Sequence, residues 1–281
     1  MKSAKNGIVK MGLSLFFVFT SCEKDSDTLK NDKETIKETK VDLGTHKVMT
    51  YSIIHNTKYL IVFESGLGDG HSVWDEKKIP AQLNAKLDIV SYDRAGYGKS
   101  DKDSKPRNIN QLRSELETVI NNFSNGRKVI LVGHSLGGMI IRDYAVKNPS
   151  KVAGLLFIDP SHEYYNQPTQ EEEDMLYNLF KTNFGENFGG TLEAREIIED
   201  SQYMATLPHL PNIPVIVISS LKVDASTSES DKQKWFKAHE LLKDGVSDFT
   251  HVSTTKSGHY IMYDEPNLVI DNFNLLLSKI K

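Results

Sequence analysis

The sequence has one cysteine, Cys22, in 281 residues, so no disulfide can form within the chain. Positive charge is not in excess either, since 34 lysines and arginines stand against 38 acidic residues and give a formal net charge of −4. Nucleic-acid binding relies on clustered positive charge, so this balance argues against nucleic acid as a partner. The fold must therefore rest on a hydrophobic core, for which a hydrophobic content of 38% is ordinary.

Long apolar runs and cofactor motifs are missing as well. The apolar stretch at residues 11–19 is too short to span a bilayer, which takes roughly 20 helical residues. The sequence has no His-Glu-x-x-His motif, and no Gly-x-Gly-x-x-Gly motif follows an expected strand. We therefore expect neither a metal ion nor a cofactor.

The first 21 residues have the composition of an export signal. Lys2, Lys5 and Lys10 precede the apolar stretch, and small residues follow it just before Cys22. The segment resembles a bacterial lipoprotein signal, which implies cleavage before Cys22 and attachment of lipid to its thiol. We expect residues 1–21 to be a signal peptide and the mature protein to be held at a membrane of the cell envelope. The alternative is a plain signal peptide and a periplasmic or secreted protein.

Residues 22–40 are almost wholly charged or small and polar after Cys22. Such a segment cannot bury enough apolar surface to order itself, so we expect a flexible tether here. A single domain is expected over residues 41–281.

Short runs of valine, isoleucine and leucine alternate with segments of helical periodicity in this domain. Continuous apolarity is typical of parallel strands that are covered on both faces. The pattern predicts an α/β fold with a mostly parallel sheet and helices on both sides. The expected strands are 59–64, 87–92, 128–132, 152–158, 215–219 and 248–253, and the clearest helices are 110–123 and 136–147.

One interval lacks strand patterns, between Pro160 and Pro211. It is too long for a turn and has acidic, helix-like sequence on either side of a glycine-rich stretch. We expect a helical lid at about residues 161–210, inserted after the sixth strand and lying over the strand ends.

A serine lies where a strand runs directly into a helix. Ser135 has Gly133 two residues before it and Gly137 two residues after it. This G-x-S-x-G pattern is typical of a sharp strand–turn–helix that presents a hydroxyl at the helix N-terminus. The sequence therefore predicts that Ser135 is a nucleophile.

The sequence resembles the α/β-hydrolase superfamily from residue 41 to the C-terminus. The resemblance is carried by residues 64–68, 92–100, 133–138 and 257–260, which follow one another in the family's order. It implies that the backbone N–H groups of Leu67 and Leu136 form the oxyanion hole. It also implies that residues 93–100 organise loops and do not act in the site.

His259 is the expected base. It lies in a glycine-flanked loop after a strand-like segment and before the final helix, and the chain order nucleophile, acid, histidine is that of this fold. We expect four other histidines to be inert surface residues, namely His55, His209, His239 and His251.

The acid has two candidates. Asp224 follows the expected strand 215–219, near the usual position, but Ser220 stands where a glycine is common. Asp159 ends the preceding strand and is followed by Pro160, and a carboxylate that orients an imidazole must be held rigidly. We expect Asp159 to be the acid, with Asp224 as the alternative.

A serine nucleophile narrows the chemistry. Dehalogenases and epoxide hydrolases of this fold use a carboxylate nucleophile, whereas serine forms an acyl-enzyme. We expect hydrolysis of an ester or related acyl substrate, of the carboxylesterase type, with a small acyl molecule as the partner. The alternatives are an acyltransferase and a binding protein on the same scaffold.

Overall fold

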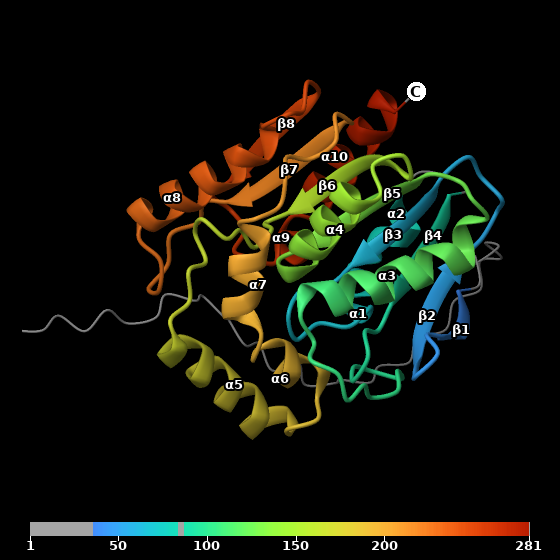
Figure 1. Cartoon of the computed structure of the whole chain (residues 1–281). Helices are drawn as coiled ribbons and strands as arrows, with labels where there is room; N and C mark the ends of the chain where they lie inside the picture. The colour runs from blue at the N-terminus through green and yellow to red at the C-terminus, as the bar shows by residue number, and fades with distance from the viewer. Residues whose placement is uncertain (1–35, 84–86, 281) are drawn as a thin grey trace, which may run out of the picture.

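The computed structural model describes residues 36–83 and 87–280. The expected signal peptide, Cys22 and most of the expected tether lie outside these residues. Eight strands form one sheet in the order β1-β2-β4-β3-β5-β6-β7-β8 (Figure 1). The strands are β1 (Lys37–Asp42), β2 (Lys47–Ile53), β3 (Leu60–Glu64), β4 (Asp88–Tyr92), β5 (Val129–His134), β6 (Val152–Ile158), β7 (Val215–Ser220) and β8 (Phe249–Thr254).

Strands β3 to β8 pair in parallel, and β1 and β2 are antiparallel to their neighbours. The helices are α1 (Ser72–Asp75), α2 (Ile79–Gln82), α3 (Ile109–Ser124), α4 (Leu136–Lys147), α5 (Gln170–Phe184), α6 (Gly189–Glu193), α7 (Ile197–Met204), α8 (Glu229–Glu240), the 3-10 turn η1 (Leu241–Lys243), α9 (Ile261–Asp264) and α10 (Pro266–Lys279).

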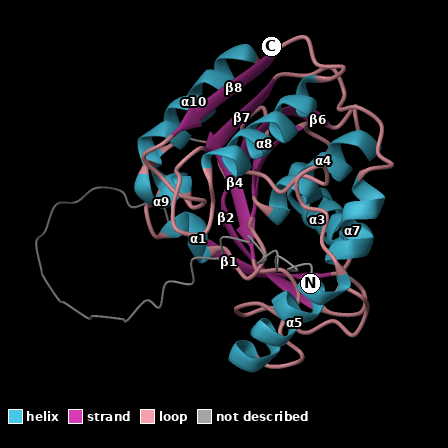
Figure 2. Cartoon of the chain, turned by 90° about the vertical axis from the view of Figure 1, so that its left-hand side faces the viewer, coloured by secondary structure: helices cyan, strands magenta, loops and turns pink. Residues whose placement is uncertain are grey.

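The sheet separates two hydrophobic cores. On β5, Val129 and Leu131 contribute to the core that contains α3 and α4, whereas Ile130 and Val132 contribute to the core that contains α9 and α10. All six residues of β5 are buried, because successive side chains point to opposite faces and helices cover both faces (Figure 2). The predicted α/β architecture, with a mostly parallel sheet between two helical layers, is confirmed.

The expected strands and helices lie within two residues of their predicted bounds, but β1 and β2 were missed. β1 begins at Lys37, so it includes the last four residues of the segment expected to be tether. It is an edge strand with one buried residue, Val41, which pairs with Val48 of β2. A strand that buries a single side chain lacks the apolar run by which the other strands were predicted.

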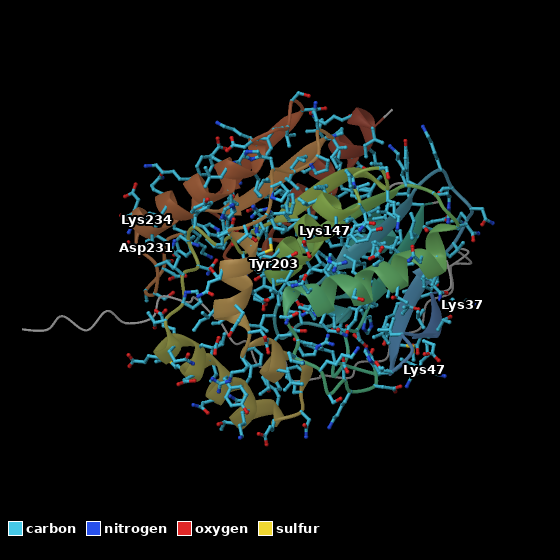
Figure 3. The ribbon with its side chains drawn as sticks, in the orientation of Figure 1. Lys37, Lys47, Lys147, Tyr203, Asp231 and Lys234 are labelled. Carbon is cyan, nitrogen blue, oxygen red and sulfur yellow. The ribbon has the colours of Figure 1, made fainter. Side chains whose placement is uncertain are left out.

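Three helices, α5, α6 and α7, occupy the interval between β6 and β7, and no strand occurs among these described residues. They project beyond one end of the sheet (Figure 1). Leu176, Phe180 and Ala194 form a small core of their own inside this segment. Tyr203 of α7 lies against α4, where its hydroxyl donates to Asp143 Oδ1 at 2.9 Å (Figure 3). Within the described residues, no helix is long and apolar enough to cross a membrane.

Candidate active site

Ser135 occupies a strained turn between β5 and α4. Its φ is 53° and its ψ is −122°, a backbone conformation that costs a non-glycine residue free energy and is concentrated at functional sites. Glycines on either side make the turn possible, because a Cβ at Gly133 would lie 2.7 Å from the Gly137 carbonyl oxygen and a Cβ at Gly137 would lie 2.3 Å from the Glu64 carbonyl oxygen. The predicted strand–turn–helix around Ser135 is present.

Asp159 and His259, which are 100 residues apart in the sequence, meet at the carboxyl end of the sheet. His259 Nδ1 lies 2.7 Å from Asp159 Oδ2. The other carboxylate oxygen, Oδ1, accepts hydrogen bonds from the Ser220 backbone N–H at 2.8 Å and from the Trp235 indole N–H at 2.6 Å. Burial alone would raise the pKa of Asp159, but the hydrogen bond and charge of His259 outweigh it and hold that pKa below its usual range. Asp159 is therefore a buried anion that is hydrogen-bonded to the imidazole.

Asp224 does not reach His259. Its side chain is exposed, and its Oδ1 accepts hydrogen bonds from the backbone N–H groups of Ser226 and Thr227 at 2.7 and 2.9 Å and from both of their hydroxyls. The structure thus brings Asp159 to the imidazole and leaves Asp224 in its own loop.

The hydroxyl of Ser135 lies 3.5 Å from that of Ser161, and no hydrogen bond between Ser135 and His259 occurs among the described residues. His134 connects the turn at Ser135 with the loop that carries His259. Its Nε2 lies 3.1 Å from the His259 carbonyl oxygen, and the two imidazole rings are 4.6 Å apart. Burial lowers the pKa of His134 to about 3, so this ring is neutral and donates from Nε2. Nucleophile–base hydrogen bonds are often long before substrate binds.

The two N–H groups assigned to the oxyanion hole are unused. Neither the Leu67 N–H nor the Leu136 N–H donates to another described residue. The loop that carries Leu67 is held by Arg94, which donates to the carbonyl oxygens of Ser65 and Gly66, each at 2.7 Å. Two free donors beside a nucleophile are what an oxyanion requires.

Arg94 also ties this loop to α6. Its guanidinium makes two hydrogen bonds to Glu193, at 2.8 and 2.9 Å, and one to Glu64 at 2.9 Å. All three side chains are buried. Burial raises the pKa of Glu64 to about 7, although the Arg94 guanidinium opposes that shift. The loop-organising role that the resemblance implied for this segment agrees with these contacts.

Asp69 is a site residue that the sequence did not indicate. Its Oδ2 is buried without a hydrogen-bond partner among the described residues and lies 3.9 Å from His134 Nδ1. Burial raises the pKa of Asp69 to about 6. Asp69 directly follows residues 64–68, which carry part of the family resemblance. That position in the sequence could have indicated it as a candidate site residue.

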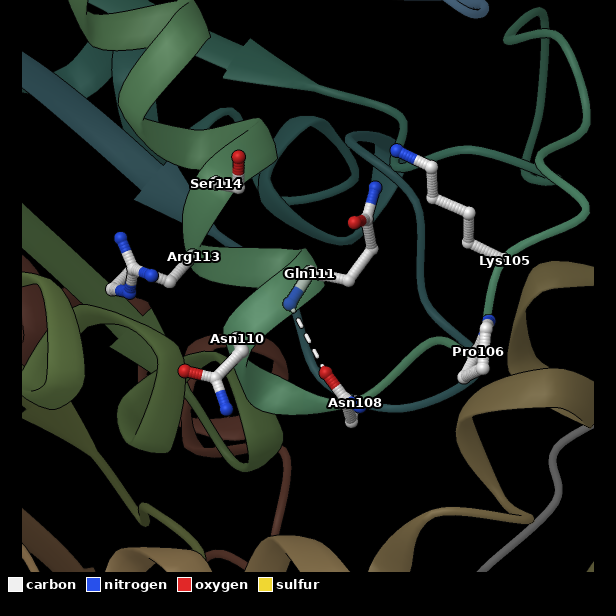
Figure 4. Close-up of a pocket in the computed structure, with 7 residues that line it drawn as sticks. All are labelled: Lys105, Pro106, Asn108, Asn110, Gln111, Arg113 and Ser114. Atoms are coloured by element: carbon white, nitrogen blue, oxygen red, sulfur yellow. Dashed lines mark hydrogen bonds between the residues drawn. The ribbon is translucent and has the colours of Figure 1, made fainter.

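Two other features do not belong to this site. His46, Asp103 and Glu115 hold potential ligand atoms within 4.8 Å of one another, but the Arg107 guanidinium pairs with both oxygens of Glu115 and already supplies the positive charge. The cluster is a buried ion-pair network and does not fit a metal ion. A surface hollow over the first turn of α3 contains none of the predicted site residues (Figure 4); it is lined by Lys105, Pro106, Asn108, Asn110, Gln111, Arg113 and Ser114.

Known proteins show similarity to the sequence and to the fold. The uncharacterized protein YqjL of Bacillus subtilis (strain 168) is 27% identical over 209 residues, which cover 74% of this chain and 79% of YqjL. The human (lyso)-N-acylphosphatidylethanolamine lipase is 30% identical over 115 residues, 40% of this chain and 33% of the lipase. The 1-acylglycerol-3-phosphate O-acyltransferase ABHD5 of Sus scrofa is 30% identical over 127 residues, 41% of this chain and 34% of that enzyme.

Among solved structures, Cfl2 from Burkholderia cenocepacia has a TM-score of 0.66 at 15% identity and covers 87% of this chain and 97% of its own. A monoacylglycerol lipase from Paleococcus ferrophilus has a TM-score of 0.63 at 17% identity, with 83% and 99% covered. These likenesses concern the fold. The family model of the alpha/beta hydrolase fold matches residues 59–270, well over half of the sequence, so this protein belongs to the α/β-hydrolase family.

Proposed function

We propose that this protein hydrolyses a carboxylic ester through an acyl-enzyme on Ser135. His259 is the base, Asp159 the acid, and the N–H groups of Leu67 and Leu136 stabilise the oxyanion. One observation carries the proposal: a buried carboxylate holds an imidazole at 2.7 Å beside a strained serine. Strain, a rigid acid and unused donors coincide at the carboxyl ends of β3, β5 and β6, which are neighbours in the sheet.

The geometry supports a defined order of proton transfers. Asp159 accepts from His259 Nδ1, so Nε2 carries the lone pair that takes the Ser135 proton as Oγ attacks the carbonyl carbon. Negative charge then develops on the carbonyl oxygen, which the two free N–H groups can bind. His259 returns the proton to the leaving alcohol, and water repeats the sequence in reverse to release the acid and restore Ser135.

The relatives support an ester as the substrate class, because one of them is named a lipase. A second relative is named an O-acyltransferase, which favours transfer to an alcohol as the second candidate function. Adding an alcohol acceptor to a reaction with a chromogenic ester separates the two. An acyltransferase forms the new ester faster than it releases free acid, and a hydrolase does the reverse.

Labelling with a fluorophosphonate tests the nucleophile. Wild type should be labelled and should release a chromogenic alcohol from short acyl esters, whereas Ser135→Ala should lose both because it lacks the hydroxyl that forms the acyl-enzyme. Ser161→Ala is the matched control, since it removes the hydroxyl 3.5 Å away. If Ser135→Ala keeps the label and turnover, the proposed function is wrong; if the wild type is neither labelled nor active on these esters, the alternative of a binding protein is favoured instead.

We also propose export and lipid attachment at Cys22, which rest on the sequence at residues 1–22. A single acyl chain anchors a protein weakly and two or more anchor it stably. Wild type should fractionate with membranes, and Cys22→Ala should become soluble. A soluble wild type whose N-terminus lies beyond Cys22 would instead indicate a plain signal peptide.

A further inference from the structure

Four side chains next to the proposed acid form a continuous hydrogen-bonded series, here named the imidazole network: Ser219 of β7, His239 and Glu240 of α8, and His251 of β8. Ser219 Oγ lies 2.5 Å from His239 Nδ1 and 2.7 Å from His251 Nε2. His251 Nδ1 is hydrogen-bonded to Glu240 Oε1. His239 is fully buried and the His251 side chain is 5% exposed, so neither is the inert surface histidine that was expected.

The network ends on a peptide group that connects acid and nucleophile. His239 Nε2 lies 2.7 Å from the Pro160 carbonyl oxygen. The N–H of the same peptide group, which belongs to Ser161, donates to the Ser135 carbonyl oxygen at 2.9 Å. This peptide group joins Pro160 to Ser161, one residue beyond Asp159, and it is held on one side by the network and on the other by the turn at Ser135.

The bonding partners determine which atoms carry protons. A carbonyl oxygen can only accept, so His239 must donate from Nε2. Burial lowers the pKa of His239 to about 3, so the ring is neutral and its Nδ1 must accept from the Ser219 hydroxyl. Ser219 has one hydrogen, so His251 must donate to it from Nε2. His251 Nδ1 and the Glu240 carboxylate then need one further proton between them.

We infer that the imidazole network positions the peptide group between Asp159 and Ser135, and that this positioning is complete only when the His251–Glu240 pair holds that further proton. The inference rests on the proposed function, because the residues it aligns are the proposed acid and nucleophile. When the His251–Glu240 pair loses that proton, two acceptor atoms face each other at one contact of the network, so the network has one hydrogen bond fewer.

Several charged groups face this end of the network. Glu240 approaches His251 from α8, and its Oε2 is 3.6 Å from Lys243 Nζ. The charge of Asp159 acts on His251 from the end of β6. Phe236 stacks on the ring at 4.1 Å, and Phe249 packs against its edge at 6.2 Å. Burial lowers the pKa of His251 while Glu240 opposes that shift, so the pair loses its proton as the pH rises.

Glu240→Gln tests the proton requirement, because its amide N–H can donate to His251 Nδ1 at every pH and completes the series with neutral groups. Wild-type kcat should fall by about five- to tenfold on the alkaline side, the effect of one unmade hydrogen bond. In Glu240→Gln that alkaline loss should disappear while KM changes little. Glu229→Gln makes the same charge change at an exposed position of α8 and should keep the wild-type profile.

A second pair of variants tests the contact with Pro160. His239→Phe removes the donor and should lower kcat about tenfold, whereas His239→Gln keeps a donor at the position of Nε2 and should recover most of the loss. The two His239 variants are also compared by NMR of the full chain, through the imidazole ¹⁵N resonances of His259. This measurement does not depend on catalytic activity. The resonances should move in His239→Phe and return in His239→Gln.

An alkaline loss that persists in Glu240→Gln, or His259 resonances that are unchanged in His239→Phe, would overturn the inference. These results differ from failure of the proposed function, which is a Ser135→Ala variant that still turns over ester. If His239→Phe does not fold, the Glu240→Gln profile decides by itself.

Discussion

The turn after β6 and the loop after β7 lie at the same edge of the sheet, and each presents an aspartate. Asp159 is buried and has three donors from three different elements, namely Ser220, Trp235 and His259. Asp224 is exposed, and its donors are Ser226 and Thr227, two and three residues further along its own loop. The Asp159 carboxylate is fixed by contacts with distant segments, whereas the Asp224 carboxylate stabilises the local conformation of its own loop.

This difference suits Asp159, and not Asp224, to the proposed role of orienting the imidazole. Asp159 has a φ of 43°, a left-handed conformation that is unfavourable for a non-glycine residue, and the hydrogen bonds around it maintain that conformation. An orienting group must keep one geometry while the imidazole gains and loses a proton. A residue that caps its own loop on the surface has no such constraint.

The largest expected effect comes from Asp159→Asn. The amide cannot balance the charge that develops on His259 and favours the wrong tautomer, so kcat should fall by about 10⁴ with KM little changed. Steady-state kinetics on a chromogenic ester measure this, with circular dichroism to confirm folding. If a folded variant loses less than about tenfold, Asp159 is not the acid.

Trp235→Phe should have an intermediate effect. It removes the indole N–H from Asp159 Oδ1 and keeps an aromatic ring, so one carboxylate oxygen loses a charge-assisted hydrogen bond. We expect kcat to fall about tenfold, the value of one such bond. A second measurement in the Asp159→Asn background should show a smaller loss, because the two side chains act through one contact. Equal losses in both backgrounds would contradict that coupling.

Asp224→Asn should have the smallest effect, less than about threefold in kcat, as for most surface substitutions. The substitution should instead change how the stability of the fold depends on pH. Hydrogen bonds from Ser226 and Thr227 lower the pKa of Asp224 to about 2, below its usual value of about 3.9. The carboxylate therefore stabilises the fold above about pH 4, and this contribution is lost as the pH falls towards 2.

Urea unfolding at a series of acidic pH values follows that contribution. The part of the acid destabilisation that comes from Asp224 should be absent in Asp224→Asn. A large loss of activity in the variant at neutral pH would reverse the comparison between the two aspartates.

The sequence predicted the features that depend on neighbouring residues. Runs such as β5 and β6 are apolar because both faces of the sheet are buried, so their positions can be read from composition alone. The turn at Ser135 needs small residues at Gly133 and Gly137, and that steric requirement is visible in five residues. Strand β1 was missed because it is an edge strand that buries only Val41, and β2 was missed because Thr50 and Ser52 interrupt its apolar residues.

The tertiary structure decided the features that depend on distance between remote residues. The sequence alone named two aspartates, and the pairing of Asp159 with His259 appears only when β6 and the loop after β8 meet. Trp235 and His239 had no motif, because a single donor that points at one carboxylate or carbonyl oxygen leaves no pattern along the chain. Periodicity records which side chains are buried, but hydrogen bonds between distant segments are set by the packing that brings them together.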